Sequence, residues 1–216
     1  MPSNLSPDLS SVASPADFLT TLAQAAHSLH HKTDRPSAPS VVAALLAAEK
    51  TAKQQRLSFP AAALLGRWQL WFTAPRNAHF KENVATGRGF YVPQIAPAEI
   101  SFSSVDSSPE CRFSQLAIGN QVQVGALRLK LTGPARYLGK KNLLAFDFTE
   151  WQLSAFGRPL YRREFRGGRT TAENFANQPI AKLPFFAFFL ITEDFIAARG
   201  RGGGIALWVR QGEPTA

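Results

Sequence analysis

Three histidines with helical spacing are the first residues whose pattern could do chemistry. His27, His30 and His31 stand at i, i+3 and i+4 of a segment with helical periodicity. Imidazoles on one helix face can ligate a metal ion, but a complete site needs a fourth ligand, and none is apparent. A polar helix face explains the same spacing more simply. We therefore expect no metal site and no cofactor.

Asp147 and Glu150 are the candidates for acid chemistry. Asp147 lies between Phe146 and Phe148, and apolar surroundings of this kind raise the pKa of a carboxyl group. The competing interpretation is an outward-facing residue of an alternating strand. All four histidines precede residue 80 and Cys111 is the single cysteine, so neither a Ser-His-Asp nor a Cys-His arrangement can be assembled. We expect no catalytic residues and a protein that is not an enzyme.

A glycine–tryptophan step opens the first strand-like segment, at Gly66 and Trp68. In a small β-barrel, the glycine permits a tight turn under the floor and the indole closes that end. An arginine of the last strand can then stack on the ring, and Arg210 is the candidate. The alternative is an ordinary core tryptophan.

The segment 194–204 is rich in glycine and arginine. Asp194 and Arg199 are expected to flank a short turn between two strands, where an ion pair would fix the connection. The alternative is an anion-binding nest, in which the backbone amides around Gly200 act with Arg199 or Arg201. The segment is not a P-loop, because it lacks the Lys-Ser/Thr ending and no helix pattern follows.

Charge and aromatic content restrict the partners. The 216 residues include 24 Lys and Arg against 15 Asp and Glu, a net charge of +9 that suits an anionic partner. Aromatic residues among the arginines of 158–169 are compatible with single-stranded nucleic acid, but an anionic membrane explains the charge equally well and no nucleic-acid motif is present. We expect peripheral contact with anionic lipids and no nucleic acid. The 17 Phe indicate a large core or an apolar cavity.

The first quarter of the chain indicates helices. Residues 1–14 are rich in Ser and Pro and are expected to be disordered. A helical segment is predicted over 15–58, with one helix starting at Ser14-Pro15 and a second, capped by Ser40, over 41–55. The longest apolar run, 183–191, is about half of the roughly 20 residues that a bilayer helix needs. Without a secretory or transit pattern, we expect a cytoplasmic protein.

After residue 60 the hydrophobic period changes from 3.6 to 2, which predicts strands. The candidates are 64–73, 90–92, 99–103, 112–118, 121–131, 143–151, 159–165, 185–191 and 204–210. Within 121–131 the apolar parity switches at Gly125-Ala126, which we interpret as a β-bulge. About eight short strands without a long helix between them favour an antiparallel barrel or a sandwich. We predict a mainly β, lipocalin-like antiparallel barrel of about eight strands over 60–212, preceded by two short α-helices. Its lumen would be just wide enough for one small ligand, and many aromatic rings are available to line it.

Side-chain parity gives the residues expected to line the lumen and bind the ligand. They are Leu70, Phe72, Ile100, Phe102, Leu129, Phe146 and Phe148. If the parity is reversed, Trp71 and Asp147 point inside instead.

Two stretches resemble one family. Leu65 to Thr73 resembles the opening strand of the plastid lipid-associated protein (PAP)/fibrillin family, and Asp194 to Gly200 with Gly203 to Arg210 resembles its closing segment. The stretches 143–149 and 184–189 are similar to cyanobacterial members. The resemblance covers roughly residues 60–210.

The resemblance implies a lipocalin-like barrel that binds small hydrophobic molecules such as lipids, quinones or carotenoids, on thylakoids or plastoglobules. Gly66, Trp68, Asp194, Arg199, Gly200 and Arg210 are the structural motif positions, and no family-wide catalytic residue is implied. We expect a binding or structural protein peripheral to the thylakoid of a cyanobacterium, or to plastid-type lipid bodies. The alternatives are a bilin-handling enzyme with Asp147 or Glu150 as the acid, and a structural protein whose lumen is filled by its own rings.

Overall fold

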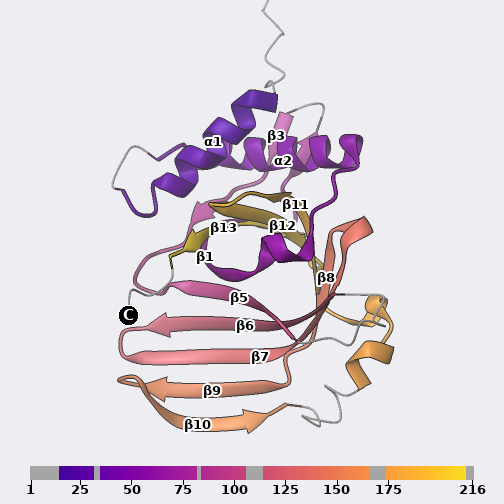
Figure 1. Ribbon diagram of the computed structural model, residues 1–216. Coiled ribbons are helices and arrows are strands. Elements are labelled where there is room, and N and C mark those ends of the chain that lie inside the picture. Colours follow the sequence, from indigo (N-terminus) through magenta and orange to yellow (C-terminus); the bar gives the residue numbers. More distant parts are fainter. Residues whose placement is uncertain (1–14, 32–34, 82–83, 106–113, 166–173, 213–216) are drawn as a thin grey trace, which may run out of the picture.

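The computed structural model describes residues 15–31, 35–81, 84–105, 114–165 and 174–212 (Figure 1). The predicted disordered segment 1–14 and Cys111 lie outside these ranges. Helices α1 (Pro15–His27) and α2 (Ala38–Gln55) come first. The strands that follow are β1 (Gly66–Ala74), β2 (His79–Lys81), β3 (Val84–Thr86), β4 (Phe90–Tyr91), β5 (Ala98–Ser104), β6 (Ser114–Val124), β7 (Leu127–Leu138), β8 (Leu143–Phe146), β9 (Glu150–Ala155), β10 (Arg158–Glu164), β11 (Phe185–Ile191), β12 (Phe195–Gly200) and β13 (Ile205–Gln211). No helix among these residues is long and apolar enough to cross a bilayer.

Eight strands close an antiparallel barrel. Its order is β7-β6-β5-β1-β13-β12-β11-β8, and β8 pairs with β7 again to complete the ring. Every neighbouring pair is antiparallel, as expected for strands joined by short turns. The predicted fold class, a mainly β barrel of eight strands preceded by two helices, is confirmed.

Strand β7 has two different partners along its length. Residues 127–132 pair with β9, whereas residues 135–138 pair with β8. The exchange takes place at Gly133, where an added Cβ would lie 1.9 Å from the carbonyl oxygen of Asp147. Because β9 also pairs with β10, the sheet continues past the barrel wall as β6-β7-β9-β10, which we call the extended sheet. Figure 1 shows β9 and β10 on the side opposite the helices.

Two large hydrophobic clusters, out of three among the described residues, hold the barrel and the helices together. One fills the barrel interior and contains Trp68, Phe102, Phe146 and Trp208. The other joins the helices to the outer surface of the barrel, where Leu22 and Leu45 are fully buried. The strands β1, β11, β12 and β13 therefore contribute apolar side chains on both faces, which explains the continuous hydrophobic runs in β11, β12 and β13.

Helix α2 begins earlier than the sequence predicted. The Ser37 hydroxyl accepts a hydrogen bond from the Ser40 amide at 3.3 Å, and Pro39 occupies the first turn. Ser40, the predicted cap, therefore lies inside the first turn. Helix α1 is attached through Trp71, whose Nε1 donates to the Ala25 carbonyl at 2.7 Å.

The predicted ion pair between Asp194 and Arg199 is wrong. The segment between them is strand β12 rather than a turn, so the two residues lie about 16 Å apart along an extended chain. Arg199 instead donates to Glu49 of α2, with Nε–Oε1 2.9 Å and Nη2–Oε2 2.5 Å. The anion nest is not formed either, because Arg199 and Arg201 donate to the carbonyls of Gly203 and Leu183.

Two strand predictions also needed correction. The predicted bulged strand 121–131 is a hairpin, in which Val124 pairs with Leu127 around a two-residue turn. Across such a turn, residues of opposite parity share a face, so the parity switch at Gly125-Ala126 marks a reversal of the chain rather than a bulge. The predicted strand 143–151 is divided between β8 and β9.

Candidate ligand-binding site

The barrel interior is packed with aromatic rings of the protein itself. The ring of Phe186 lies 5.1 Å from that of Phe146 and 5.4 Å from that of Trp208. The rings of Phe102 and Phe188 meet edge to face at 6.2 Å. Tyr137 is also buried here, and burial raises the pKa of its hydroxyl to about 12.

Arg210 of the last strand stacks on Trp68 of the first barrel strand, as the sequence predicted. The Arg210 guanidinium carbon lies 3.9 Å from the Trp68 ring centroid, within the range of a cation–π contact. Arg210 Nη1 also donates to the Leu65 carbonyl at 3.1 Å, and its Nε donates to the Glu193 carbonyl. Gly66 has φ +120°, and a Cβ there would lie 2.8 Å from Arg210 Nη1. Gly66 thus leaves room for the arginine that stacks on Trp68.

The inner face of the barrel continues onto the extended sheet. Directly paired residues of an antiparallel sheet share a face, and so does every second residue along a strand. Leu116 and Ile118 of β6 lie in the interior cluster, so Val122 and Val124 continue the same face. The pairing of β6 with β7, of β7 with β9 and of β9 with β10 extends this face to those neighbouring strands. We call this surface the inner face of the extended sheet, and it comprises Val122, Val124, Leu127, Leu129, Leu131, Trp151, Leu153 and Tyr161.

Exposure on the inner face is high for apolar side chains. The exposed fractions are 59% for Val124, 52% for Leu127 and 42% for Leu129. Trp151 is half-buried, and its ring lies 5.1 Å from that of Tyr161. A contiguous apolar surface of this kind marks a binding surface, because exposing it to water is costly.

The opposite face of the extended sheet is polar. Gln121, Gln123, Arg128, Lys130, Gln152, Ser154 and Arg162 occupy it. Arg128 Nη2 donates to Gln123 Oε1 at 3.0 Å, and Arg162 forms an ion pair with Glu150 at 2.6 Å. The extended sheet therefore has one polar face, which suits contact with water, and one apolar face, which suits contact with an apolar molecule.

Five of the seven predicted ligand-binding residues lie in or against the interior cluster. Ile100, Phe102 and Phe146 are buried in it, whereas Leu70 and Phe148 are partly buried against it. The lumen placement of Phe72 is wrong. A register shift between Leu70 and Phe72 turns Phe72 outward, where it packs under the helices.

The lumen placement of Leu129 is also wrong, for a different reason. Leu129 has the predicted parity, but β9 has replaced β8 as the neighbour of β7 at that point, and the side chain is exposed on the inner face. Sequence reasoning missed Val122, Val124, Leu127 and Leu153 of this face. Their alternation with Gln123, Arg128 and Gln152 was the signal that could have found them.

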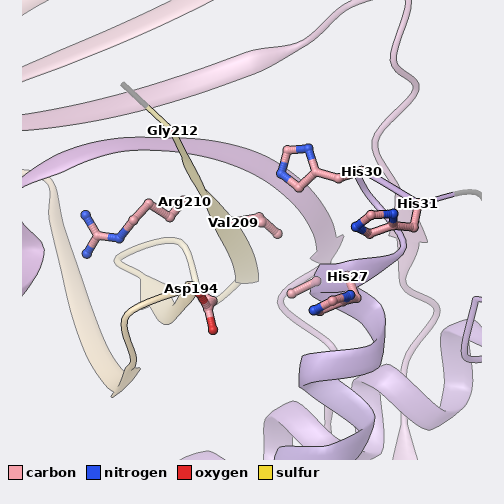
Figure 2. Close-up of a pocket in the computed structure, with 8 residues that line it drawn as sticks. His27, His30, His31, Asp194, Val209, Arg210 and Gly212 are labelled. Carbon is pink, nitrogen blue, oxygen red and sulfur yellow. The ribbon is translucent and has the colours of Figure 1, made fainter. Parts of the chain in front are cut away.

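A pocket of about 270 Å³ lies outside the barrel at the end of α1 (Figure 2). It is lined by Ala26, His27, His30, His31, Asp194, Val209, Arg210 and Gly212. The rings of His27 and His31 stack at 5.4 Å, and the Arg210 side chain extends away from the imidazoles. Within the described ranges, no three His, Cys, Asp or Glu side chains are grouped so that they could hold a metal.

The acid candidates lie at the junction between barrel and extended sheet. The amide of Asp147 donates to the Pro134 carbonyl at 3.1 Å, which fixes the backbone beside Gly133. Glu150 is the partner of Arg162 on the polar face. The two residues are thus tied to sheet structure rather than to a pocket.

No protein-family model matches this chain, and no curated protein matches it either.

Proposed function

We propose that the protein binds a small hydrophobic molecule, such as a lipid, quinone or carotenoid, on the inner face where the barrel opens. The observation that carries the proposal is the continuity of an apolar surface from the packed interior to the exposed residues Val124, Leu127 and Leu129. An eight-stranded barrel is compatible with lipocalin-like binding.

The chemistry of the inner face suits such a ligand. Burying apolar surface stabilises a complex by about 25 cal/mol per Å² before the costs of association. Asn120 lies on the same face, paired with Ile100 and Leu131, and the Tyr161 hydroxyl lies further along it. These two polar groups can orient a ligand that carries a carbonyl or hydroxyl group.

The resemblance to the PAP/fibrillin family supports the same function and suggests its setting. We include in the proposal a place at a thylakoid membrane or at lipid globules, peripheral to the lipid. The cation–π contact between Trp68 and Arg210 supports a structural rather than a chemical role for these motif positions.

A second candidate function follows from the ring packing in the interior. With rings as close as 5.1 Å, the lumen resembles a core, which favours a structural protein without a ligand. The two candidates differ in what the inner face does, because a purely structural barrel gains nothing from exposed leucines there.

Quenching of tryptophan fluorescence by a short-chain benzoquinone distinguishes the two. Trp68 and Trp71 are fully buried and Trp208 is buried, so the half-buried Trp151 reports on the inner face. We expect saturable quenching in the native protein. Leu129→Asp places a charge on the apolar surface and should weaken binding by about tenfold or more.

Gln152→Asp is the matched control, because it adds the same charge to the polar face beside Lys130. It should leave the quinone affinity unchanged. Quenching that rises linearly without saturation, or that is the same in Leu129→Asp, would contradict the proposal and support the ligand-free alternative.

A further inference from the structure

Two hairpin tips lie side by side at the outer corner of the extended sheet. The turn between β6 and β7 is Gly125-Ala126, and the turn between β9 and β10 is Phe156-Gly157. The Phe156 amide donates to the Ala126 carbonyl at 3.0 Å, so the two turns form one edge. We call this edge the hairpin edge.

Phe156 is the most unusual residue of the hairpin edge. Its side chain is 86% exposed, and its backbone has φ +49°, followed by Gly157 at φ +77°. A bulky residue in the left-handed region is strained, and this two-residue turn favours Asn-Gly. Leu160, beside a register shift in β10, is 63% exposed. The protein thus holds an aromatic ring in water at a position that folding disfavours, which points to an external contact.

The charges around the hairpin edge have one sign. The segments 121–131 and 152–163 contain no Asp or Glu and carry the cations Arg128, Lys130, Arg158 and Arg163, together with Arg162, which is paired with Glu150. The register places Arg128 and Lys130 on the polar face, whereas Arg158 pairs with Ala155 of the inner face. Cations therefore flank the apolar tip on both sides, an arrangement complementary to a negatively charged surface.

We infer that the hairpin edge inserts into the surface of an anionic lipid membrane. Phe156 and Leu160 enter the boundary between headgroups and acyl chains, and the flanking Arg and Lys contact the lipid phosphates. Insertion places the inner face against the lipid, so an apolar molecule can reach it without crossing water. The inference extends the proposed function, since it gives the route of the ligand, but the two are measured separately.

Sedimentation with vesicles tests the inference on the full chain. The vesicles consist of phosphatidylcholine with or without phosphatidylglycerol. We expect the native protein to bind the anionic vesicles, with binding that falls as salt is raised. Phe156→Asn should weaken this binding by about tenfold, because it removes the inserted ring. The same change should maintain or raise the melting temperature, because Asn-Gly suits the turn.

Phe80→Asn is the matched control, because Phe80 is an exposed phenylalanine on β2, in the β2–β3 hairpin beside α2 and away from the hairpin edge. It should bind vesicles like the native protein. Arg128→Gln with Lys130→Gln should remove only the preference for phosphatidylglycerol.

Three outcomes would overturn the inference: no vesicle binding by the native protein, equal binding by Phe156→Asn, or a dimer in solution that Phe156→Asn dissociates. The last would assign the hairpin edge to a second copy of the chain. Benzoquinone titration of Phe156→Asn without vesicles separates the proposals. Saturable quenching by Phe156→Asn together with lost vesicle binding supports membrane insertion beside a separate ligand site. Linear quenching of the native protein, together with vesicle binding that Phe156→Asn loses, contradicts the ligand site alone.

Discussion

Replacing Gly133 with alanine is expected to destabilise the barrel by about 3 kcal/mol or more. The added Cβ would lie 1.9 Å from the Asp147 carbonyl oxygen and 3.0 Å from the Phe148 Cα, and both are backbone atoms that cannot rotate away. Relief requires β7 to separate from the chain that leads from β8 to β9. The free energy of unfolding in urea, followed by far-UV circular dichroism, measures this loss.

Gly202→Ala is the control for this prediction, because a Cβ at Gly202 meets nothing within 4 Å. It should leave the unfolding midpoint within experimental error of the native value. If Gly133→Ala unfolds at the same urea concentration as the native protein, then β7 does not exchange its partners at this close contact.

Replacing Glu49 with glutamine is expected to cost about 3 kcal/mol of stability, because it leaves the Arg199 guanidinium without its anionic partner in a mostly buried site. Arg199 donates two hydrogen bonds to the carboxylate, and Lys53 adds a third at 2.9 Å. The pair fastens α2 to β12, so the helical layer should loosen first. Urea unfolding measured with near-UV circular dichroism follows this change.

The ion pair between Glu49 and Arg199 should also make the stability of the protein depend on pH. Burial of Glu49 raises its pKa, but hydrogen bonds and charge from Arg199 and Lys53 outweigh this and hold the pKa below the usual 4.5. A carboxyl with a lowered pKa in the folded state stabilises the fold above pH 4.5. This stabilisation is lost as the pH falls through the folded value.

The native protein should therefore lose more stability below pH 4.5 than Glu49→Gln does. Glu150→Gln is the matched control, since its pair with Arg162 is largely exposed and contributes about 1 kcal/mol at most. Parallel pH profiles for the native protein and Glu49→Gln would show that the ion pair does not couple to folding.

The barrel could be predicted because its signals are local, and the Trp68–Arg210 contact because the first and last strands pair when a barrel closes. Alternating strands separated by turn residues indicate an antiparallel barrel, and Gly66, Trp68 and Arg210 indicate a contact between its first and last strands. Each of these patterns depends on residues whose neighbours in space follow from strand pairing.

The errors arose where a local pattern has two physical explanations. The parity switch at Gly125-Ala126 fits a bulge and a hairpin equally well. Phe195 to Gly200 lacks alternation because β12 is buried on both faces, so it was interpreted as a turn. The Glu49–Arg199 pair joins residues 150 positions apart, and no local pattern indicates it.

The candidate site was predicted in part for a similar reason. Parity gives the face of a strand, and it placed Leu129 on the same face as the barrel interior. Parity does not give the point where β7 exchanges β8 for β9, which depends on the close approach of Gly133 to Asp147. A residue can therefore have the correct face and still lie outside the lumen.

Native mass spectrometry tests the central claim, that the inner face binds an apolar molecule, most directly. The native protein, Leu129→Asp and Gln152→Asp would be purified from a pigment-producing photosynthetic host, with and without organic extraction. The account predicts an extractable lipid, quinone or carotenoid on the native protein and on Gln152→Asp, and little on Leu129→Asp. An empty native protein, or an equal load on Leu129→Asp, would contradict it.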